Sequence, residues 1–250
     1  MFKTLRDAFR IKDLRKKLLY TFMMLVVVRF GSELPIPGVK TDFFANFFAN
    51  QSTDAFGFFN AMTGGSFSSM SIFALSITPY ITSSIIIQLL TIAIPKLEEM
   101  QKEGEDGRKK LTALTRYVTV VLALIESTAM AVGFGRQGLL EKFNFVNAAI
   151  VVLTLTAGSA FLMWIGERIT EKGVGNGISI VLLINILSRI PSDMTSLYEK
   201  FISGKGLASG GLAAIIIIAI ILVLVVFTVI LQDAERRIPV QYSQKVQGRK

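Results

Sequence analysis

Residues 212–231 form a run of twenty positions in which Thr228 is the single polar side chain. A bilayer core about 30 Å thick is crossed by a helix of roughly 20 apolar residues, so this run predicts a transmembrane helix. Five further apolar segments meet the same criterion: residues 18–34, 71–94, 117–134, 148–165 and 178–190. The sequence therefore predicts an all-α, polytopic transmembrane helical bundle with six spans in a single membrane domain, residues 1–250.

Composition agrees with this class and excludes several others. The chain is 52% hydrophobic and 18% charged, and its mean hydropathy is +0.56, which is too apolar for an ordinary soluble domain. It contains no His and no Cys, which removes disulfides, thiol and Ser-His catalysis and the common zinc sites. No phosphate-binding loop motif is present. We expect no enzyme activity, no cofactor and no metal site.

Basic residues are distributed unevenly between the segments that separate the predicted spans. Alternate segments, including both chain ends, hold 20 of the 27 Lys and Arg residues, and the opposite set holds 7. Because Lys and Arg concentrate in cytoplasmic loops, both ends are predicted to be cytoplasmic. This places residues 1–17, 96–116 and 232–250 inside the cell, and the net charge of +9 needs no DNA partner. Residues 18–34 are favoured as an uncleaved span over a signal peptide, because the apolar run continues past Arg29.

The segment 55–94 is too long for one span and is interrupted by Gly64-Gly65 and by Pro79. We predict a half-helix over residues 56–69 followed by a full helix over 71–94. Two interpretations of the half-helix remain open. It lines a pathway through the membrane, as broken helices often do, or it lies flat on the bilayer as an amphipathic helix. The hydroxyl side chains interleaved with isoleucines after residue 76 are explained by helix packing.

Two other features of the spans carry expectations. Glu126 lies near the middle of the third span, where an ionised side chain costs about 2.5–3.5 kcal/mol, so it should face a cavity or a partner, or be protonated. The turn GVGNG at residues 173–177 is a weak nucleotide motif because it follows a membrane helix; it is better explained as a tight loop that lets two helix ends approach. Residues 101–110 are expected to form a solvated charged loop.

Several stretches have a distinctive spelling: RFGSELPIPG at 29–38, SIFALSITPYITSSIIIQLL at 71–90, KEGEDGRKK at 102–110, TRY at 115–117, FLMWIGERITEKGVGNGISI at 161–180, RRIPVQY at 236–242 and QGRK at 247–250. These stretches resemble the bacterial SecY family of protein-conducting channels, and the similarity runs along the whole chain. The resemblance implies a channel of ten helices in two inverted halves of five. This chain then supplies the first half plus one helix.

The resemblance also implies roles for individual residues. The implied pore ring, which closes the idle channel with bulky apolar side chains, is Ile77, Ile81, Ile178 and Leu182. The implied plug is the half-helix 56–69, with Phe56, Phe59, Asn60, Met62, Gly64, Gly65, Phe67 and Ser69. The implied share of the lateral gate, the seam that opens to lipid, is Thr82, Ile86 and Glu126. The implied docking site for the motor ATPase SecA and the ribosome is Arg236, Arg237, Arg249 and Lys250.

By resemblance, the protein is a multi-pass component of the bacterial plasma (inner) membrane that passes unfolded secretory proteins across the membrane and releases membrane proteins into it. Its implied partners are SecE, SecG, SecA, the ribosome, signal peptides and secretory precursors, besides the lipid bilayer. Because the chain stops inside the docking loop, we expect a truncated protein that is inactive alone. The alternative from another class is a secondary transporter of small solutes, which also uses broken helices; a membrane-embedded enzyme is a weaker alternative.

Overall fold

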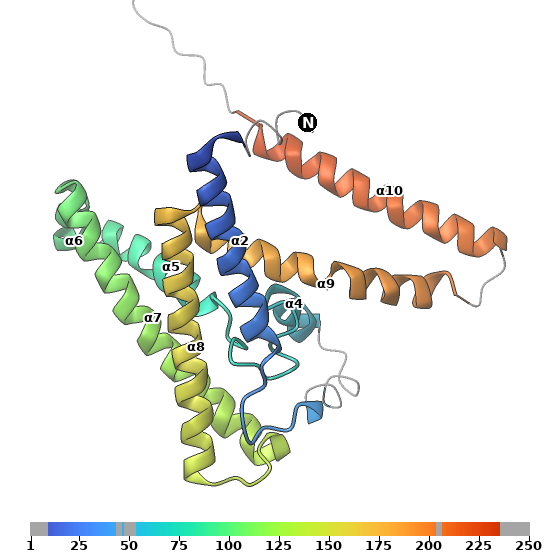
Figure 1. The fold of residues 1–250 in the computed structure, drawn as a ribbon, viewed down its shortest axis with the longest axis horizontal. Helices are drawn as coiled ribbons and strands as arrows, with labels where there is room; N and C mark the ends of the chain where they lie inside the picture. The colour runs from blue at the N-terminus through green and yellow to red at the C-terminus, as the bar shows by residue number, and fades with distance from the viewer. Residues whose placement is uncertain (1–9, 44–46, 48–53, 204–206, 236–250) are drawn as a thin grey trace, which may run out of the picture. The chain divides into compact units, whose positions relative to one another are not determined.

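The computed structural model describes residues 10–43, 47, 54–203 and 207–235. Within these ranges the regular structure is helical (Figure 1). The elements are α2 (Lys12–Glu33), α4 (Asp54–Met62), α5 (Thr78–Ala93), α6 (Pro95–Lys102), α7 (Glu105–Phe134), the π-helix η1 (Gly135–Leu139), α8 (Phe145–Lys172), α9 (Gly177–Phe201) and α10 (Leu207–Gln232). The chain divides into two compact units, Met1–Ile190 and Pro191–Lys250, and each is treated separately.

The broken span differs from its prediction in where the helices lie. α4 ends at Met62, and residues 63–77 form consecutive turns before α5 begins at Thr78. Two residues in this stretch, Met70 and Ser76, have positive φ angles of 45° and 53°, and L-residues seldom adopt that region inside a helix. The predicted half-helix over 56–69 and full helix over 71–94 are therefore both shortened, because residues 63–77 are not helical. We call residues 63–77 the connector.

Proline and glycine positions explain several helix boundaries. Pro79 lies in the first turn of α5 and Pro95 in the first turn of α6, where a missing N–H costs nothing. The chain bends by 102° between α5 and α6. α7 begins after Gly104, whose φ is 81°. The charged loop predicted at residues 101–110 is thus mostly helical, because the end of α6 and the first turns of α7 occupy it.

α9 also runs further than predicted. The sequence places the end of the fifth span before Pro191, but the helix continues through that proline to Phe201. A proline inside a helix removes one backbone hydrogen bond without always ending the helix. The fourth and sixth predicted spans, 148–165 and 212–231, fall inside the longer helices α8 and α10.

Four of the described helical segments are long and apolar enough to cross a membrane, and these are Glu105–Leu139, Phe145–Lys172, Gly177–Phe201 and Gly210–Gln232. The bent pair α5 and α6 adds a fifth if it is treated as one broken span. α2, which carries the first predicted span, does not meet this criterion. The first of the six spans therefore stays a prediction, whereas the helical bundle itself is confirmed.

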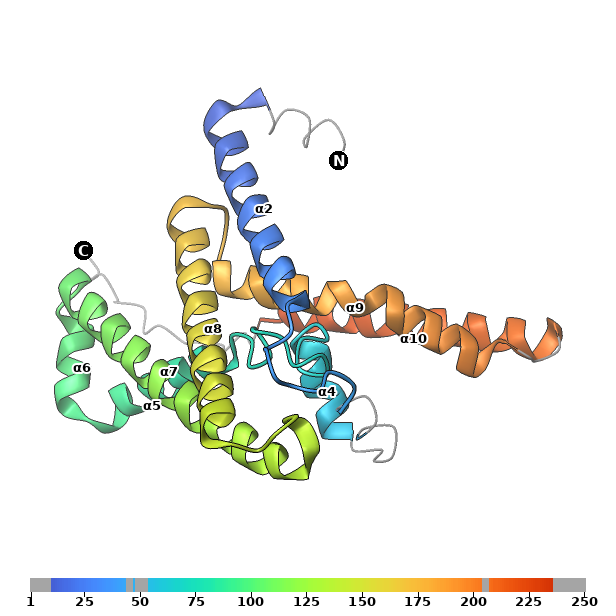
Figure 2. The same ribbon diagram turned by 60° about the horizontal axis from the view of Figure 1, so that its bottom comes forward.

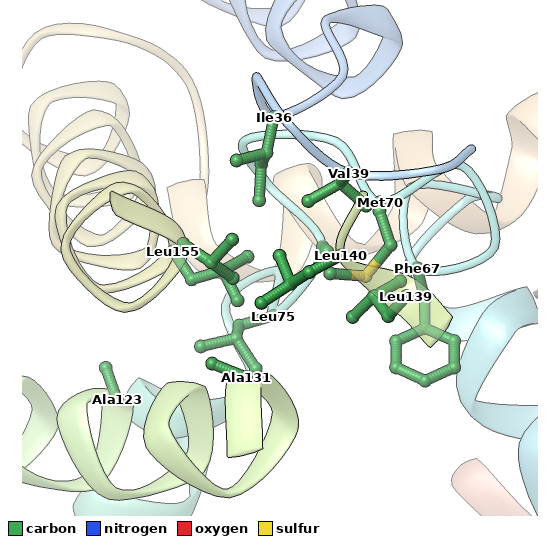
Figure 3. Packing of buried hydrophobic residues seen from close by; sticks show 12 residues of the cluster. Ile36, Val39, Phe67, Met70, Leu75, Ala123, Ala131, Leu139, Leu140 and Leu155 are labelled. Carbon is green, nitrogen blue, oxygen red and sulfur yellow. The ribbon is translucent and has the colours of Figure 1, made fainter. Parts of the chain in front are cut away.

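In the first unit, α7 contacts α5, α6 and α8, and α2 contacts α8 (Figures 1 and 2). A buried apolar cluster lies where the connector meets the end of α7 and the middle of α8. Figure 3 shows Met70 and Leu75 of the connector directed toward Leu139, Leu140 and Leu155. Two isolated bridges, Pro35 to Ser71 and Val39 to Leu140, hold the chain after α2 against this cluster.

Hydroxyl groups join the helices, as the sequence predicts. Ser83 of α5 donates to the Thr115 carbonyl oxygen of α7 at 3.0 Å and lies 2.6 Å from the Thr119 hydroxyl. Ser127 of α7 and Thr156 of α8 are 3.0 Å apart. Short polar side chains of this kind stabilise helix contacts in lipid, where there is no hydrophobic force between helices.

Candidate functional site

The connector is largely buried although it is not helical, and backbone hydrogen bonds tie it to the chain after α2. Ile36 donates its N–H to the Met70 carbonyl at 3.0 Å, and Ile72 donates to the Leu34 carbonyl at 2.9 Å. Non-helical backbone at membrane depth is tolerated only where protein or a water-filled cavity surrounds it. The arrangement therefore favours the pathway interpretation of the broken span over a helix lying on the membrane surface.

Ser76, near the end of the connector, is held by two helices. Asn185 of α9 donates from Nδ2 to the Ser76 hydroxyl at 3.1 Å, and Ser159 of α8 donates to the Ser76 carbonyl at 3.3 Å. Asn185 therefore links α9 to the connector. The two contacts hold Ser76 in its left-handed conformation, which lacks the support of a regular helix at this position.

Small residues let these elements approach closely. A Cβ built on Gly158 of α8 would lie 2.1 Å from the Ile72 carbonyl oxygen, and one on Gly177 would lie 2.0 Å from the Gly166 carbonyl oxygen. Real Cβ atoms essentially never come within 3.0 Å of another heavy atom. The predicted role of the turn at 173–177, close approach of two helix ends, is therefore confirmed.

The structure brings three of the four proposed ring residues into one apolar cluster. Ile77, Ile81 and Ile178 belong to it, and a Cβ on Gly166 would touch both Ile178 and Ile77. Ile77, however, has no exposed surface, whereas Ile81, Ile178 and Leu182 are half-buried. The assignment of the four residues to a pore ring stays a prediction. In such a ring the buried Ile77 would support the half-buried side chains instead of lining the opening.

The proposed plug residues fall on α4 and the connector. Phe59 and Phe67 meet edge to face with ring centroids 5.0 Å apart. Asn60 accepts the Ser68 N–H at 3.1 Å, and Ser69 donates to the Gly65 carbonyl at 3.1 Å. These local contacts give the segment a compact shape. Of the other proposed plug residues, Met62 is half-buried at the end of α4, and Phe56 lies outside the side chains that the structure describes.

Gly64 and Gly65 turn the chain sharply after α4. Their φ angles are 69° and 89°, values that glycine adopts without strain. Gly64 also touches α9, because a Cβ there would lie 2.8 Å from the Asn185 carbonyl oxygen. The sequence identifies the break at these glycines correctly, but it does not reveal the neighbour that they contact.

Glu126 faces a cavity, as the sequence predicts. The cavity has a volume of about 410 Å³ and is lined by Glu126 with Phe59, Phe67, Leu75, Thr78, Ala129, Met130 and Phe134. Its walls come from α4, the connector, the start of α5 and α7. The other two proposed gate residues, Thr82 and Ile86, are exposed on α5 and do not line this cavity.

The contacts of two arginine side chains were not predicted from the sequence. Arg29 of α2 donates to the Ser188 hydroxyl at 3.0 Å and to the Gly64 carbonyl at 3.4 Å. Arg116 of α7 pairs with Glu167 of α8 at 2.8 Å. In each case the partners are far apart in the chain, so sequence spacing gives no signal. Arg29 could have been singled out only as a cation inside an otherwise apolar segment.

The four basic residues proposed for docking, Arg236, Arg237, Arg249 and Lys250, lie outside the described residues.

The fold and the site together define a class: a multi-pass helical membrane protein with one broken span whose connector is buried by neighbouring helices. Comparison with known proteins makes this specific. The SecY family model matches residues 71–250, and the chain belongs to the SecY family. Solved structures agree in fold. One titled "The structure of a protein conducting channel" has a TM-score of 0.52 at 17% identity, covering 76% of this chain and 42% of that chain.

A channel chain in the canine ribosome-channel complex from the endoplasmic reticulum has a TM-score of 0.51 at 18% identity, covering 76% of this chain and 42% of that one. Curated relatives are more similar. Protein translocase subunit SecY of Halalkalibacterium halodurans is 43% identical, over 100% of this chain and 58% of its own length. The Pseudomonas aeruginosa subunit is 41% identical, over 96% and 54%. The chain thus spans somewhat more than half the length of these relatives.

Proposed function

We propose that this chain forms the N-terminal part of the channel subunit of a protein translocase in the bacterial plasma membrane. The full subunit would pass unfolded secretory proteins across the membrane and release membrane proteins sideways into lipid. Membership of the SecY family supports this proposal. The structural observation that carries it is the buried, non-helical connector between α4 and α5, which lies beside the half-buried aliphatic side chains of Ile81 and Ile178.

The proposed ring needs only bulky apolar side chains. Ile81, Ile178 and Leu182 offer no hydrogen bonds, so a ring of such residues disfavours water and ions when it is closed. The same side chains change rotamer easily around a passing polypeptide and bind no part of it. Ile77 packs behind them against α8 and fixes their position. No covalent chemistry is needed for this task.

The plug would close the same pathway from the other side of the membrane. α4 and the connector through Ser69 are the proposed plug, in which a short helix is followed by turns over residues 63–69. The contact between Phe59 and Phe67 keeps this segment compact, so that it can move as a unit. Such a unit has to leave its seat without unfolding the helices around it.

The proposed lateral gate uses α5 and α7 as this half's wall. Thr82 and Ile86 present an exposed face of α5, and Glu126 opens into an apolar cavity beside the proposed plug. A signal peptide helix would enter along this wall. SecE, SecG, SecA and the ribosome are proposed as partners, with both ends of the chain cytoplasmic and Arg236, Arg237, Arg249 and Lys250 contributing to the docking loop.

The test uses a full-length subunit containing this chain, purified with SecE and SecG and reconstituted into vesicles. SecA, ATP and a radiolabelled secretory precursor are added, and protection of the precursor from external protease is measured. Protection that requires ATP and SecA supports the proposal. Absence of protection, combined with uptake of labelled small solutes by the same vesicles, would favour the alternative of a secondary transporter.

A further inference from the structure

Arg29 connects three parts of the first unit that are distant in sequence. It lies on α2, and one terminal nitrogen, Nη1, reaches both the Gly64 carbonyl of the connector at 3.4 Å and the Ser188 hydroxyl of α9 at 3.0 Å. The other, Nη2, forms an ion pair with Glu33 one turn further along α2. The Arg29 side chain is 30% exposed, so these contacts are partly shielded from water.

The contact lies at the point where the proposed plug meets α9. Gly64 approaches α9 so closely that a Cβ would lie 2.8 Å from the Asn185 carbonyl oxygen and 3.1 Å from the Ser188 hydroxyl. Ser188 in turn donates to the Asn185 carbonyl at 2.6 Å. Its hydroxyl proton is therefore committed to α9, and its oxygen is left to accept from Arg29. The guanidinium thus bridges the Gly64 carbonyl and a fixed acceptor on α9.

Two hydroxyl groups of the connector add no hydrogen bond to its seat. The hydroxyl oxygens of Ser66 and Ser71 are buried and have no hydrogen-bond partner. Seating the segment here leaves these groups desolvated without compensation, which is unfavourable. The charged bridge from Arg29 therefore has a large share in deciding whether the segment stays seated, because hydrogen bonds from a charged donor are stronger than neutral ones.

We propose that Arg29 is a latch that holds the plug against α9 in the resting channel, and that its release precedes displacement of the plug. This inference rests on the proposed function. Arg29 is not one of the proposed ring residues and acts through its contacts with Gly64 and Ser188, so it is a positioning residue. Lysine cannot replace it fully, because an ammonium lacks the planar fork that keeps Glu33 on one nitrogen and the two plug-side acceptors on the other.

The experiment measures how often the plug leaves its seat. The reporter is Ser66→Cys in the full-length subunit, in a background without other thiols. Ser66 is 1% exposed and its hydroxyl makes no hydrogen bond, so the change is mild, and the present chain has no cysteine of its own. An impermeant thiol reagent is added to resting channels, and the rate of modification reports the unseated fraction.

Arg29→Gln is expected to raise this rate by about tenfold or more, because it removes a charge-assisted bridge. Arg29→Lys and Ser188→Ala should each give a smaller rise, about threefold, since each keeps part of the bridge. Combining Arg29→Gln with Ser188→Ala should add nothing to Arg29→Gln alone, because both act on one contact. The matched control is Arg136→Gln, an arginine of η1 that packs on the Phe143 ring, which should leave the rate unchanged.

A rate that stays unchanged in folded Arg29→Gln, or that rises equally in Arg136→Gln, overturns the latch. If Arg29→Gln fails to fold, the modification rates of Arg29→Lys and Ser188→Ala are the test: a rise in both supports the latch, and unchanged rates overturn it. Channels opened by a secretory precursor should react equally fast in all variants, which separates latch loss from general damage. If the unmodified channel translocates the precursor but the Arg29 variants leave the modification rate unchanged, the latch alone is rejected. If the unmodified channel does not translocate the precursor, the proposed function is rejected.

Discussion

Gly158→Ala tests whether the connector is seated against α8 as closely as the structure has it. The added Cβ would lie 2.1 Å from the Ile72 carbonyl oxygen, more than 1 Å short of the 3.4 Å where ordinary contact begins. The obstacle is backbone that is itself fixed, because Ile72 donates its N–H to the Leu34 carbonyl. A rotamer change therefore cannot relieve the clash, and α8 and the connector have to separate.

The expected cost follows from two opposing effects. Overpacking in a tight core costs typically about 1–3 kcal/mol, and a backbone obstacle places this case near about 3 kcal/mol. Alanine gains about 1 kcal/mol over glycine inside a helix. We therefore expect a net loss of about 2 kcal/mol. The fall in Tm should be smaller than the roughly 4–8 °C that such a loss gives for 150–250 residues, because the full-length subunit is longer. The measurement is thermal unfolding of the full-length subunit in detergent.

Gly133→Ala in α7 is the matched control, because a Cβ there meets no atom within 4 Å. The same substitution should then stabilise the protein by up to about 1 kcal/mol through helix propensity alone. Opposite signs at the two positions are the signature of close packing at Gly158. Equal Tm values for the two variants would show that Gly158 is not packed closely against the connector.

Three further outcomes are expected. In single-channel recordings of the full-length subunit at normal protein levels, Ile81→Ser should raise the resting ion leak. Ile77→Ser should instead lower the free energy of unfolding by about 2–4 kcal/mol, because it opens a cavity and buries a hydroxyl. The reverse pattern would place Ile77 on the surface of the ring. A cysteine at Lys40 should react with an impermeant thiol reagent in intact cells and one at Lys109 should not, and the opposite labelling would invert the topology. The 250-residue chain alone, reconstituted with SecA and ATP, should not protect a secretory precursor from protease, because it spans only 58% of a similar subunit; full protection would show that the remainder is dispensable.

The sequence predicts the helices well where a long apolar run determines the structure. α8 and α10 contain their predicted spans, since long apolar runs leave few alternatives. It fails at α6 and the start of α7, where charged residues suggest a loop but solvated helices form. Pro191 misleads in the same way, because a proline weakens a helix without always ending it. Local pattern identifies the break at Gly64 but not its extent, since residues 63–77 take their shape from distant partners.

The candidate site shows the same division. Ile81 and Ile178, which the family resemblance places together, pack against one apolar cluster. Glu126 lines a cavity, which is one of the three alternatives that the cost of a carboxylate in lipid leaves open. Burial of Ile77 depends on the packing of α8 around Gly166, which no local spacing encodes. The contact of Arg29 with Ser188 joins residues 159 positions apart. Such contacts are consequences of the assembled bundle and become visible only in three dimensions.

The contacts of Ser76 have a consequence for how the chain is made. Its carbonyl and hydroxyl are bonded to residues that follow it by 83 and 109 positions. At a synthesis rate of about 5–20 residues per second, the second partner emerges about 5–20 s after Ser76. Until then the connector has no bonding partners for these groups and is poorly suited to lipid. We therefore expect nascent chains that end before Asn185 to keep the connector in a watery or protein-lined setting, and to enter the bilayer fully only when α9 has been synthesised.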